Sequence, residues 1–193
     1  VYTVQPEEKA VVKRFGAVIA IRGPGLKFKL PFGIDKPTFV PTERVLKEEF
    51  GFRTARPGRR TVYKERGSEQ EESLMLTGDL NVLDVQWVVQ YRIKDADRFL
   101  HRVRRRRDSI RDVSEAVMRR IVGNRLASEV LTVGRVEVAA LGREEIQRIL
   151  DDYGMGVHVQ AVKLQDVTPP DTVKPAFNAV NEARQAKEQM INE

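Results

Sequence analysis

The segment Asn81-Val-Leu-Asp-Val-Gln-Trp-Val-Val-Gln-Tyr-Arg-Ile93 decides the fold of this chain. Apolar residues occupy every second position, and the positions between them are mostly polar, interrupted by Val82 and Val88. Period two is typical of an antiparallel strand with one buried face. The segment is longer than most strands, so we expect a twisted strand at the centre of a sheet. Its buried face would carry Leu83, Val85, Trp87, Val89, Tyr91 and Ile93.

The residues before this strand also have β-type patterns. Residues 1–4 predict a short strand, and the apolar runs 10–15 and 17–22, separated by Gly16, predict a hairpin. An alternation of apolar residues with lysine, proline and glycine then predicts a further strand. Its apolar members are Leu26, Phe28, Leu30, Phe32 and Ile34. Pro31 and Pro37 favour an edge strand or an irregular strand over a central one.

The apolar face of that further strand has two interpretations. We favour a face that points into the core. The alternative is that Phe32 and Ile34, beside Gly33 at the strand end, enter the interface of a lipid bilayer. The polar segment that follows, residues 54–72, predicts an exposed and mobile loop.

The second half of the chain has helical patterns. Ser109 and Asp112 have the spacing of a capping box, and an apolar stripe follows at spacings of three and four until Gly123. The stripe consists of Ile110, Val113, Val117 and Ile121. A second helix is predicted over 136–153, with Gly154 as its C-terminal stop and a strand over 157–167 behind it.

The last segment predicts an extended helix that packs against partners. Pro169 and Pro170 break the chain, and residues 172–193 contain mostly helix-forming polar residues apart from a short apolar seam. We expect this seam and the arginine that continues it to form an oligomer interface. The interface residues would be Val173, Phe177, Val180 and Arg184.

The composition restricts the function classes. The chain has 193 residues, a net charge of +6 and no cysteine, which excludes disulfides, thiolate metal sites and cysteine nucleophiles. It contains no run of 18 apolar residues that could span a bilayer. A basic chain favours anionic partners. Both ends lie inside patterned segments, so we expect them to be cut edges of a longer protein.

The sequence predicts no catalytic, cofactor or metal site. His101 and His158 are the only histidines, and no nucleophile or phosphate-binding motif accompanies them. We interpret His158 as a satisfied structural residue on a strand and His101 as solvated.

The arginines at 102–107 have two interpretations. They could bind phospholipid phosphates, or they could be a solvated connector paired with nearby acids, which we slightly prefer. Nucleic-acid binding ranks last, because no aromatic platform accompanies the run. The five residues are Arg102, Arg104, Arg105, Arg106 and Arg107.

An ordered set of motifs runs along nearly the whole chain. The central strands carry Ser73-Leu-Met-Leu-Thr-Gly-Asp-Leu-Asn81 and the segment 85–93. Further motifs are Pro24-Gly-Leu-Lys-Phe-Lys-Leu-Pro-Phe-Gly33, Glu49-Phe-Gly-Phe-Arg53 and Leu164-Gln-Asp-Val-Thr-Pro-Pro170. Any single piece would be weak evidence, but the ordered set resembles the HflK type of the band-7 (SPFH: stomatin, prohibitin, flotillin, HflK/HflC) family.

The resemblance implies an α+β fold. We expect an antiparallel twisted sheet with packed helices, divided into a β-rich subdomain at 1–80 and an α/β subdomain at 81–168. Residues 169–193 would start a long coiled coil. The resemblance also implies a single-pass anchor upstream, a place on the periplasmic side of the bacterial inner membrane, and co-assembly with an HflC-like subunit around an FtsH-type AAA+ protease.

The leading functional hypothesis is therefore a non-enzymatic scaffold that oligomerises and regulates a membrane protease. The first rival is a lipid-binding module that organises membrane microdomains. The second is a hydrolase, which a nucleophile-directed probe would test.

Overall fold

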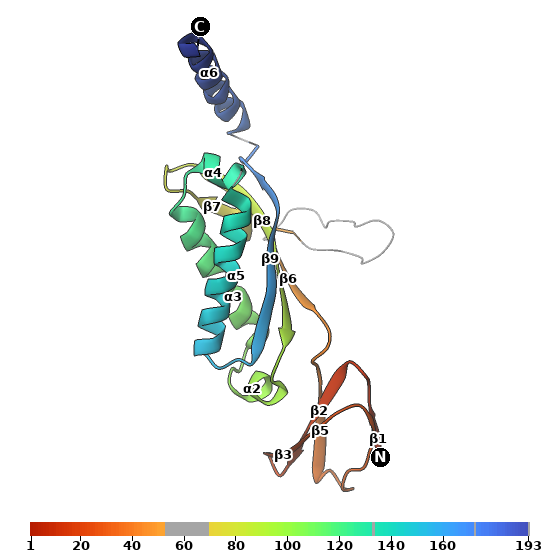
Figure 1. Ribbon diagram of the computed structural model, residues 1–193. Coiled ribbons are helices and arrows are strands. Elements are labelled where there is room, and N and C mark those ends of the chain that lie inside the picture. Colours follow the sequence, from red (N-terminus) through yellow and green to blue (C-terminus); the bar gives the residue numbers. More distant parts are fainter. Residues whose placement is uncertain (53–69, 133, 172, 193) are drawn as a thin grey trace. The chain divides into compact units, whose positions relative to one another are not determined.

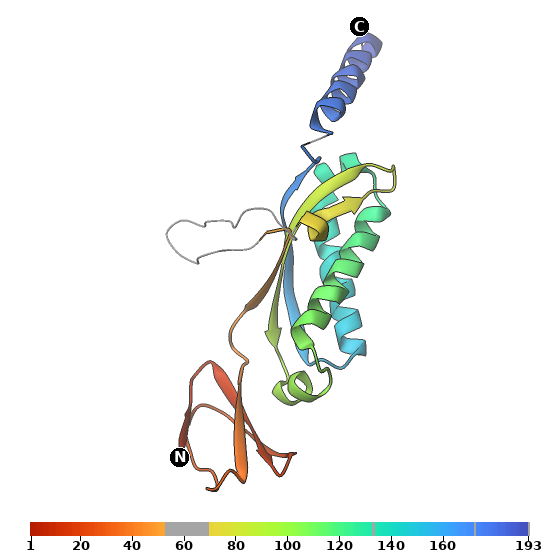
Figure 2. The same ribbon diagram turned by 180° about the vertical axis from the view of Figure 1, so that it is seen from behind.

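The computed structural model has an α+β fold and describes residues 1–52, 70–132, 134–171 and 173–192 (Figures 1 and 2). The strands are β1 (Tyr2–Val4), β2 (Glu8–Arg14), β3 (Ala17–Arg22), β4 (Gly25–Lys27), β5 (Asp35–Pro41), β6 (Leu46–Phe50), β7 (Leu74–Leu76), β8 (Val82–Ile93) and β9 (Val157–Thr168). The helices are α1 (Gln70–Ser73), α2 (Ala96–His101), α3 (Arg106–Gly123), α4 (Ala127–Leu131), α5 (Gly134–Asp152) and α6 (Lys174–Asn192).

The strand β8 is central, as the sequence predicts. It pairs with β6, β7 and β9 in a four-stranded sheet. The alternate residues from Leu83 to Ile93 are each at most 3% exposed, so the predicted face is buried. Val88, on the other face, is also buried at 4%. Burial on both faces at this point fits a strand in the interior of a sheet.

The chain divides into two compact units, and the division passes through β6, β8, α3, α5 and β9. The first unit holds residues 1–48, 88–118 and 139–163, and the second holds the rest. The expected subdomain boundaries at residues 80 and 168 stay a prediction.

The first unit contains the predicted hairpin. Antiparallel β2 and β3 pair from Ala10 with Arg22 to Arg14 with Ala17, and β5 pairs with the other side of β2. Pro37 lies on β5, which is an edge strand of this three-stranded sheet, as expected. Its core includes Val11 and Val40, which pack with Ile93 at the end of β8.

The strand predicted over residues 26–34 is wrong beyond Lys27, where β4 ends. The interpretation of this face as core is also wrong, because Leu26, Phe28 and Phe32 are 63%, 81% and 98% exposed. The physical reason is local. Pro31 has no amide hydrogen for a ladder bond, and positive φ angles at Phe32 (59°) and Gly33 (74°) turn the chain back towards β5.

The predicted apolar stripe of α3 is confirmed, because Ile110, Val117 and Ile121 are buried and Val113 is half-buried. On α5 the expected apolar side is buried at Ile146 and Leu150, but Tyr153, expected on the same side, is 54% exposed and follows the helix end. The α5 helix ends before Gly154, whose φ of 63° is the left-handed conformation of a C-terminal cap.

The predicted capping box at Ser109 is wrong. The α3 helix already begins at Arg106, and the Ser109 amide donates a hydrogen bond to the Arg105 carbonyl at 2.9 Å. Ser109 is therefore inside the first turns of the helix.

The second unit has its own aromatic core. Phe50 and Trp87 are fully buried and stack with ring centroids 4.5 Å apart. Gly51 follows with φ of 78°, and a Cβ there would lie 2.5 Å from the Ser73 Cβ, so this position requires glycine. The predicted loop at 54–72 falls mostly on 53–69, outside the described residues. Residues 70–72 are helical, as part of α1, instead of loop.

Candidate membrane and assembly surfaces

Three exposed phenylalanines gather at one end of the three-stranded sheet in the first unit. Phe15, in the turn between β2 and β3, is 87% exposed, and Phe28 and Phe32 lie in the loop before β5. Arg14 and Asp35 are opposite each other in the β2–β5 register, which places the turn and the loop at the same end. We call Phe15, Phe28 and Phe32 the aromatic tip. Ile34, expected beside Phe32, is half-buried.

Asp35 fixes the base of the aromatic tip. Its carboxylate accepts a hydrogen bond from the Arg14 Nε at 2.8 Å and from the Leu30 amide at 2.9 Å. These contacts tie the end of β2 to the loop that carries Phe28 and Phe32. The hydrogen bond from Arg14, followed by the one from the Leu30 amide, lowers the pKa of Asp35 below its usual value.

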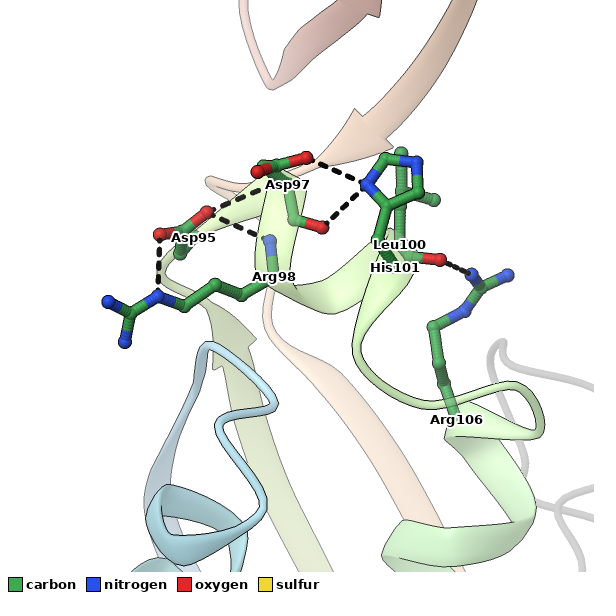
Figure 3. Close-up of polar contacts among 6 residues, drawn as sticks. All are labelled: Asp95, Asp97, Arg98, Leu100, His101 and Arg106. Carbon is green, nitrogen blue, oxygen red and sulfur yellow. Dashed lines mark hydrogen bonds and ion pairs between the residues drawn. The ribbon is translucent and has the colours of Figure 1, made fainter. Parts of the chain in front are cut away.

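The arginine segment 102–107 runs from the end of α2 into the first turn of α3, and Figure 3 shows how α2 is held. The Asp95 carboxylate caps this helix, accepting from the amides of Asp97 and Arg98 at 3.0 and 3.1 Å. Arg106 then crosses back to α2. Its Nη1 donates to the Leu100 carbonyl at 2.9 Å, and its guanidinium lies 5.4 Å from the centre of the Phe99 ring.

Arg107 contacts a buried carboxylate. Its Nε donates to Glu48 Oε1 at 2.7 Å, and the Glu48 side chain is only 3% exposed. Arg111 contacts the second oxygen of Glu48 at 3.4 Å. Tyr91 is next to this group, and its burial, followed by the negative charge of Glu48, raises the pKa of Tyr91 to about 12. Arg107 is therefore a structural counter-ion as well as a surface charge.

The other members of the segment face solvent. Arg102, Arg104 and Arg105 are exposed, and Arg105 pairs with Asp108 at 2.9 Å. From the sequence alone, the five arginines form one group. In the structure, Arg106 and Arg107 contact Leu100 and Glu48, whereas the other three lie at the surface. Nothing in the sequence near Glu48 marks it as buried, since it lies between charged neighbours.

The start of α6 flanks a cavity of about 420 Å³ in the second unit. Leu80 from the β7–β8 turn and Val82 at the start of β8 line it, together with Val173 and Val180. Val173, which directly precedes α6, is 43% exposed, and Val180 on α6 is 52% exposed. Phe177 and Arg184 also lie on α6, but their side chains are outside the described part of the structure.

Asp79, in the same turn as Leu80, also lines this cavity. Its carboxylate accepts from the Thr77 hydroxyl at 2.6 Å and from the Ala127 amide, the first residue of α4, at 3.0 Å. The hydrogen bond from Thr77 is the largest cause that lowers the pKa of Asp79. The α4 helix was missed by sequence reasoning, because its cap comes from a residue 48 positions away.

Both histidines are exposed, as expected for His101 but not for His158. His101 Nδ1 lies 2.7 Å from the Asp97 carboxylate on the same helix (Figure 3). His158 is on β9, as predicted, but its side chain is exposed, because it alternates with the buried Val157 and Val159. The interpretation of His158 as a satisfied structural residue is therefore wrong. None of the helices within the described ranges has the length and apolar character needed to cross a bilayer.

The comparisons with known proteins identify the family. The model of the SPFH domain / Band 7 family matches residues 2–193. The chain belongs to this family. The protein HflK of Treponema pallidum (strain Nichols) is 40% identical over 192 residues, which cover 98% of this chain and 58% of that relative. The protein HflK of Borreliella burgdorferi is 31% identical, over 100% of this chain and 61% of that relative.

A third SPFH relative carries a functional name. The modulator of FtsH protease HflK of Escherichia coli (strain K12) is 30% identical over 192 residues, which cover 100% of this chain and 41% of that relative. The chain thus spans between 41% and 61% of the length of these three relatives. The family resemblance of the sequence motifs is confirmed.

Proposed function

We propose that this chain is a non-enzymatic, membrane-associated scaffold domain that oligomerises with an HflC-like partner and regulates an FtsH-type protease. The observation that carries the proposal is the similarity to HflK proteins over 98–100% of the chain, one of which is named a modulator of FtsH protease. A location on the periplasmic side of the bacterial inner membrane is part of the same proposal.

Reconstitution in proteoliposomes tests this role. The full-length protein, with its HflC-like partner, is incorporated together with an FtsH-type protease, and the degradation rate of a membrane-protein substrate is measured. We expect the rate to change when the scaffold is present, and to return to the basal value when the α6 seam is disrupted by Val180→Ser. Equal rates with and without the scaffold would contradict the proposal.

The lipid-organising module is the second candidate, and the aromatic tip favours it. Three phenylalanines that are each more than 80% exposed are unusual for a soluble surface. Each side chain that enters a bilayer interface contributes about 1.5–3 kcal/mol. Aromatic contact would help an anchored domain to lie on a membrane, as proposed for Phe32 from the sequence.

Vesicle cosedimentation separates the aromatic tip from the arginine segment. We expect Phe28→Ser/Phe32→Ser to weaken binding to phosphatidylglycerol vesicles at both low and high salt. We expect Arg104→Ser/Arg105→Ser to weaken it at low salt only, because each basic residue contributes roughly 1 kcal/mol before screening. Arg106 and Arg107 are left intact because of their contacts with Leu100 and Glu48. Wild-type binding by both variants would remove the lipid role.

The hydrolase rival is tested by incubation with casein and generic ester substrates. We expect no turnover by the purified protein. Turnover that persists after contaminating proteases are removed, and that a single substitution in this chain abolishes, would overturn the non-enzymatic assignment.

A further inference from the structure

A cavity of about 430 Å³ in the first unit has a donor-rich lining that the scaffold role does not use. Three basic side chains line it. They are Lys9 on β2, Arg92 on β8 and Lys94, which directly follows β8. Thr42 and Glu43, which follow β5, form another wall. The cavity is distinct from the arginine segment 102–107.

The fold holds these walls in place. Arg92 lies between the buried Tyr91 and Ile93, so its side chain points to the opposite face of the strand. Ile93 packs with Val11 and Val40, which fixes the end of β8 against β2 and β5. The Glu43 amide donates to the Glu7 carbonyl at 3.1 Å, which fixes the chain beside Thr42.

Two buried polar atoms of this lining have no hydrogen-bond partner within the described residues. Thr42 is 5% exposed and its Oγ1 is unpaired. The Nε of Arg92 is likewise buried and unpaired. A guanidinium nitrogen can only donate, and a threonine hydroxyl can donate as well as accept. Buried donors without partners are rare in folded proteins and call for an explanation such as an unseen ion or ligand. Both atoms would be satisfied by one acceptor-rich ligand.

The charges indicate the chemistry of that ligand. Lys9, Arg92 and Lys94 are three cations, and no ion pair joins any of them to an acid in the described part of the chain. Glu43 is the one carboxylate in the lining. Because three cations outnumber it, the net charge of the lining is positive and favours the binding of an anion. A tetrahedral oxyanion offers acceptors in several directions and can bind donors that come from different strands.

We propose that this cavity binds a phosphoryl group, through Arg92 and the Thr42 hydroxyl, with Lys9 and Lys94 supplying charge. The group could come from free inorganic phosphate or from the phosphoglycerol part of a lipid headgroup, and the cavity volume leaves room for either. This inference stands whether or not the chain regulates a protease.

A titration followed by ¹H–¹⁵N NMR tests the proposal. Inorganic phosphate, sn-glycerol 3-phosphate and acetate are added separately to the 1–193 protein at constant ionic strength. We expect saturable shifts, centred on the amides of Thr42, Arg92 and Lys94 and on the Arg92 Nε–H, for the two phosphates, and weaker binding of acetate. Tighter binding of glycerol phosphate would identify the lipid-derived source, and equal binding would identify the phosphoryl group alone.

Matched variants exclude a general effect of charge. Arg92→Gln should weaken phosphate binding about tenfold, the equivalent of one lost charge-assisted contact. Arg104→Gln removes the same charge from the exposed segment and should leave the affinity unchanged. Thr42→Val removes the unpaired hydroxyl without changing the side-chain shape, and should weaken binding severalfold without lowering the melting temperature. Equal losses for Arg92→Gln and Arg104→Gln, acetate binding as tight as phosphate, or the absence of saturable shifts would each overturn the proposal.

Discussion

The ion pairs of this chain differ in how deeply the carboxylate is buried. Glu48 is buried at 3% side-chain exposure and has Arg107 and Arg111 as partners, whereas Asp108, paired with Arg105, is 53% exposed. Exposed pairs contribute little because water screens them, but a buried carboxylate that loses a hydrogen-bond donor retains its desolvation cost. The two arginines are two positions apart, so they form a matched comparison.

Arg107→Ser should therefore destabilise the fold more than Arg105→Ser. We expect a loss of about 1 kcal/mol in the free energy of unfolding for Arg107→Ser, since Arg111 still contacts Glu48, and less than about 0.5 kcal/mol for Arg105→Ser. Urea titration at pH 7 measures both values. Equal values would show that Glu48 does not depend on Arg107.

The contacts of Asp35 predict that the stability of the fold depends on pH in the acid range. Its folded-state pKa is lowered below the usual 3.8 by Arg14 and the Leu30 amide. Its contribution to stability is therefore fully present above pH 3.8 and is lost as the pH falls through the lowered folded-state value. Asp35→Asn should be less stable than the wild type at pH 7, and this difference should shrink between pH 4 and pH 2. A constant difference over that range would contradict the assignment.

At the scale of elements, long periodic segments could be predicted and short ones could not. The alternation in β8 and the stripes in α3 and α5 are properties of the local sequence, and the structure buries those faces. The 26–34 segment has the same alternation but turns at Phe32 and Gly33, so its pattern forms the aromatic tip instead of a core face. The period of a sequence shows that a segment has an apolar face, but it does not show whether another helix or strand packs against that face.

The short helix α4 shows the opposite failure. Its sequence has no side-chain capping residue, since Leu126 precedes it, and the Ala127 amide is satisfied by Asp79 from the β7–β8 turn. The candidate sites failed in the same way: Glu48, the partner of Arg107, and Lys9 and Thr42, which share a cavity with Arg92, come from distant segments and could not be found by local pattern.

Asp79→Ala should loosen α4 specifically. Loss of a capping carboxylate costs about 1 kcal/mol, and we expect faster amide hydrogen exchange over Ala127–Leu131 with little change in α5. Asp152→Ala, at the exposed end of α5, is the control for removing an aspartate. Unchanged exchange in α4 would show that the helix does not depend on Asp79, and that the buried Ala127 and Val130 and the Glu129 carboxylate, which accepts from the Leu126 amide at 3.2 Å, are enough to hold it.

At the scale of the whole molecule, we propose α6 as the element that joins copies of the chain. Its side chains are largely polar, yet Val180 on the helix and Val173 just before it stay 52% and 43% exposed beside a cavity that Leu80 and Val82 also line. Burial of such side chains against a partner contributes about 1.5–3 kcal/mol each. One weak contact does not assemble a pair in solution, but repetition in a closed ring on a membrane multiplies its effect.

The 1–193 protein should accordingly be monomeric at micromolar concentration, while the full-length protein assembles. Phe177→Ser and Val180→Ser should each disperse the full-length assembly in analytical ultracentrifugation and leave the melting temperature of the 1–193 protein nearly unchanged. Val180 is the stronger test, because the structure shows its side chain half-exposed at the cavity. The matched control is Met190→Ser, which removes a 77% exposed apolar side chain farther along the same helix and should have a smaller effect. A sharp drop in the melting temperature of either seam variant would place that residue in the core of its own chain, and α6 would then not be the assembly element.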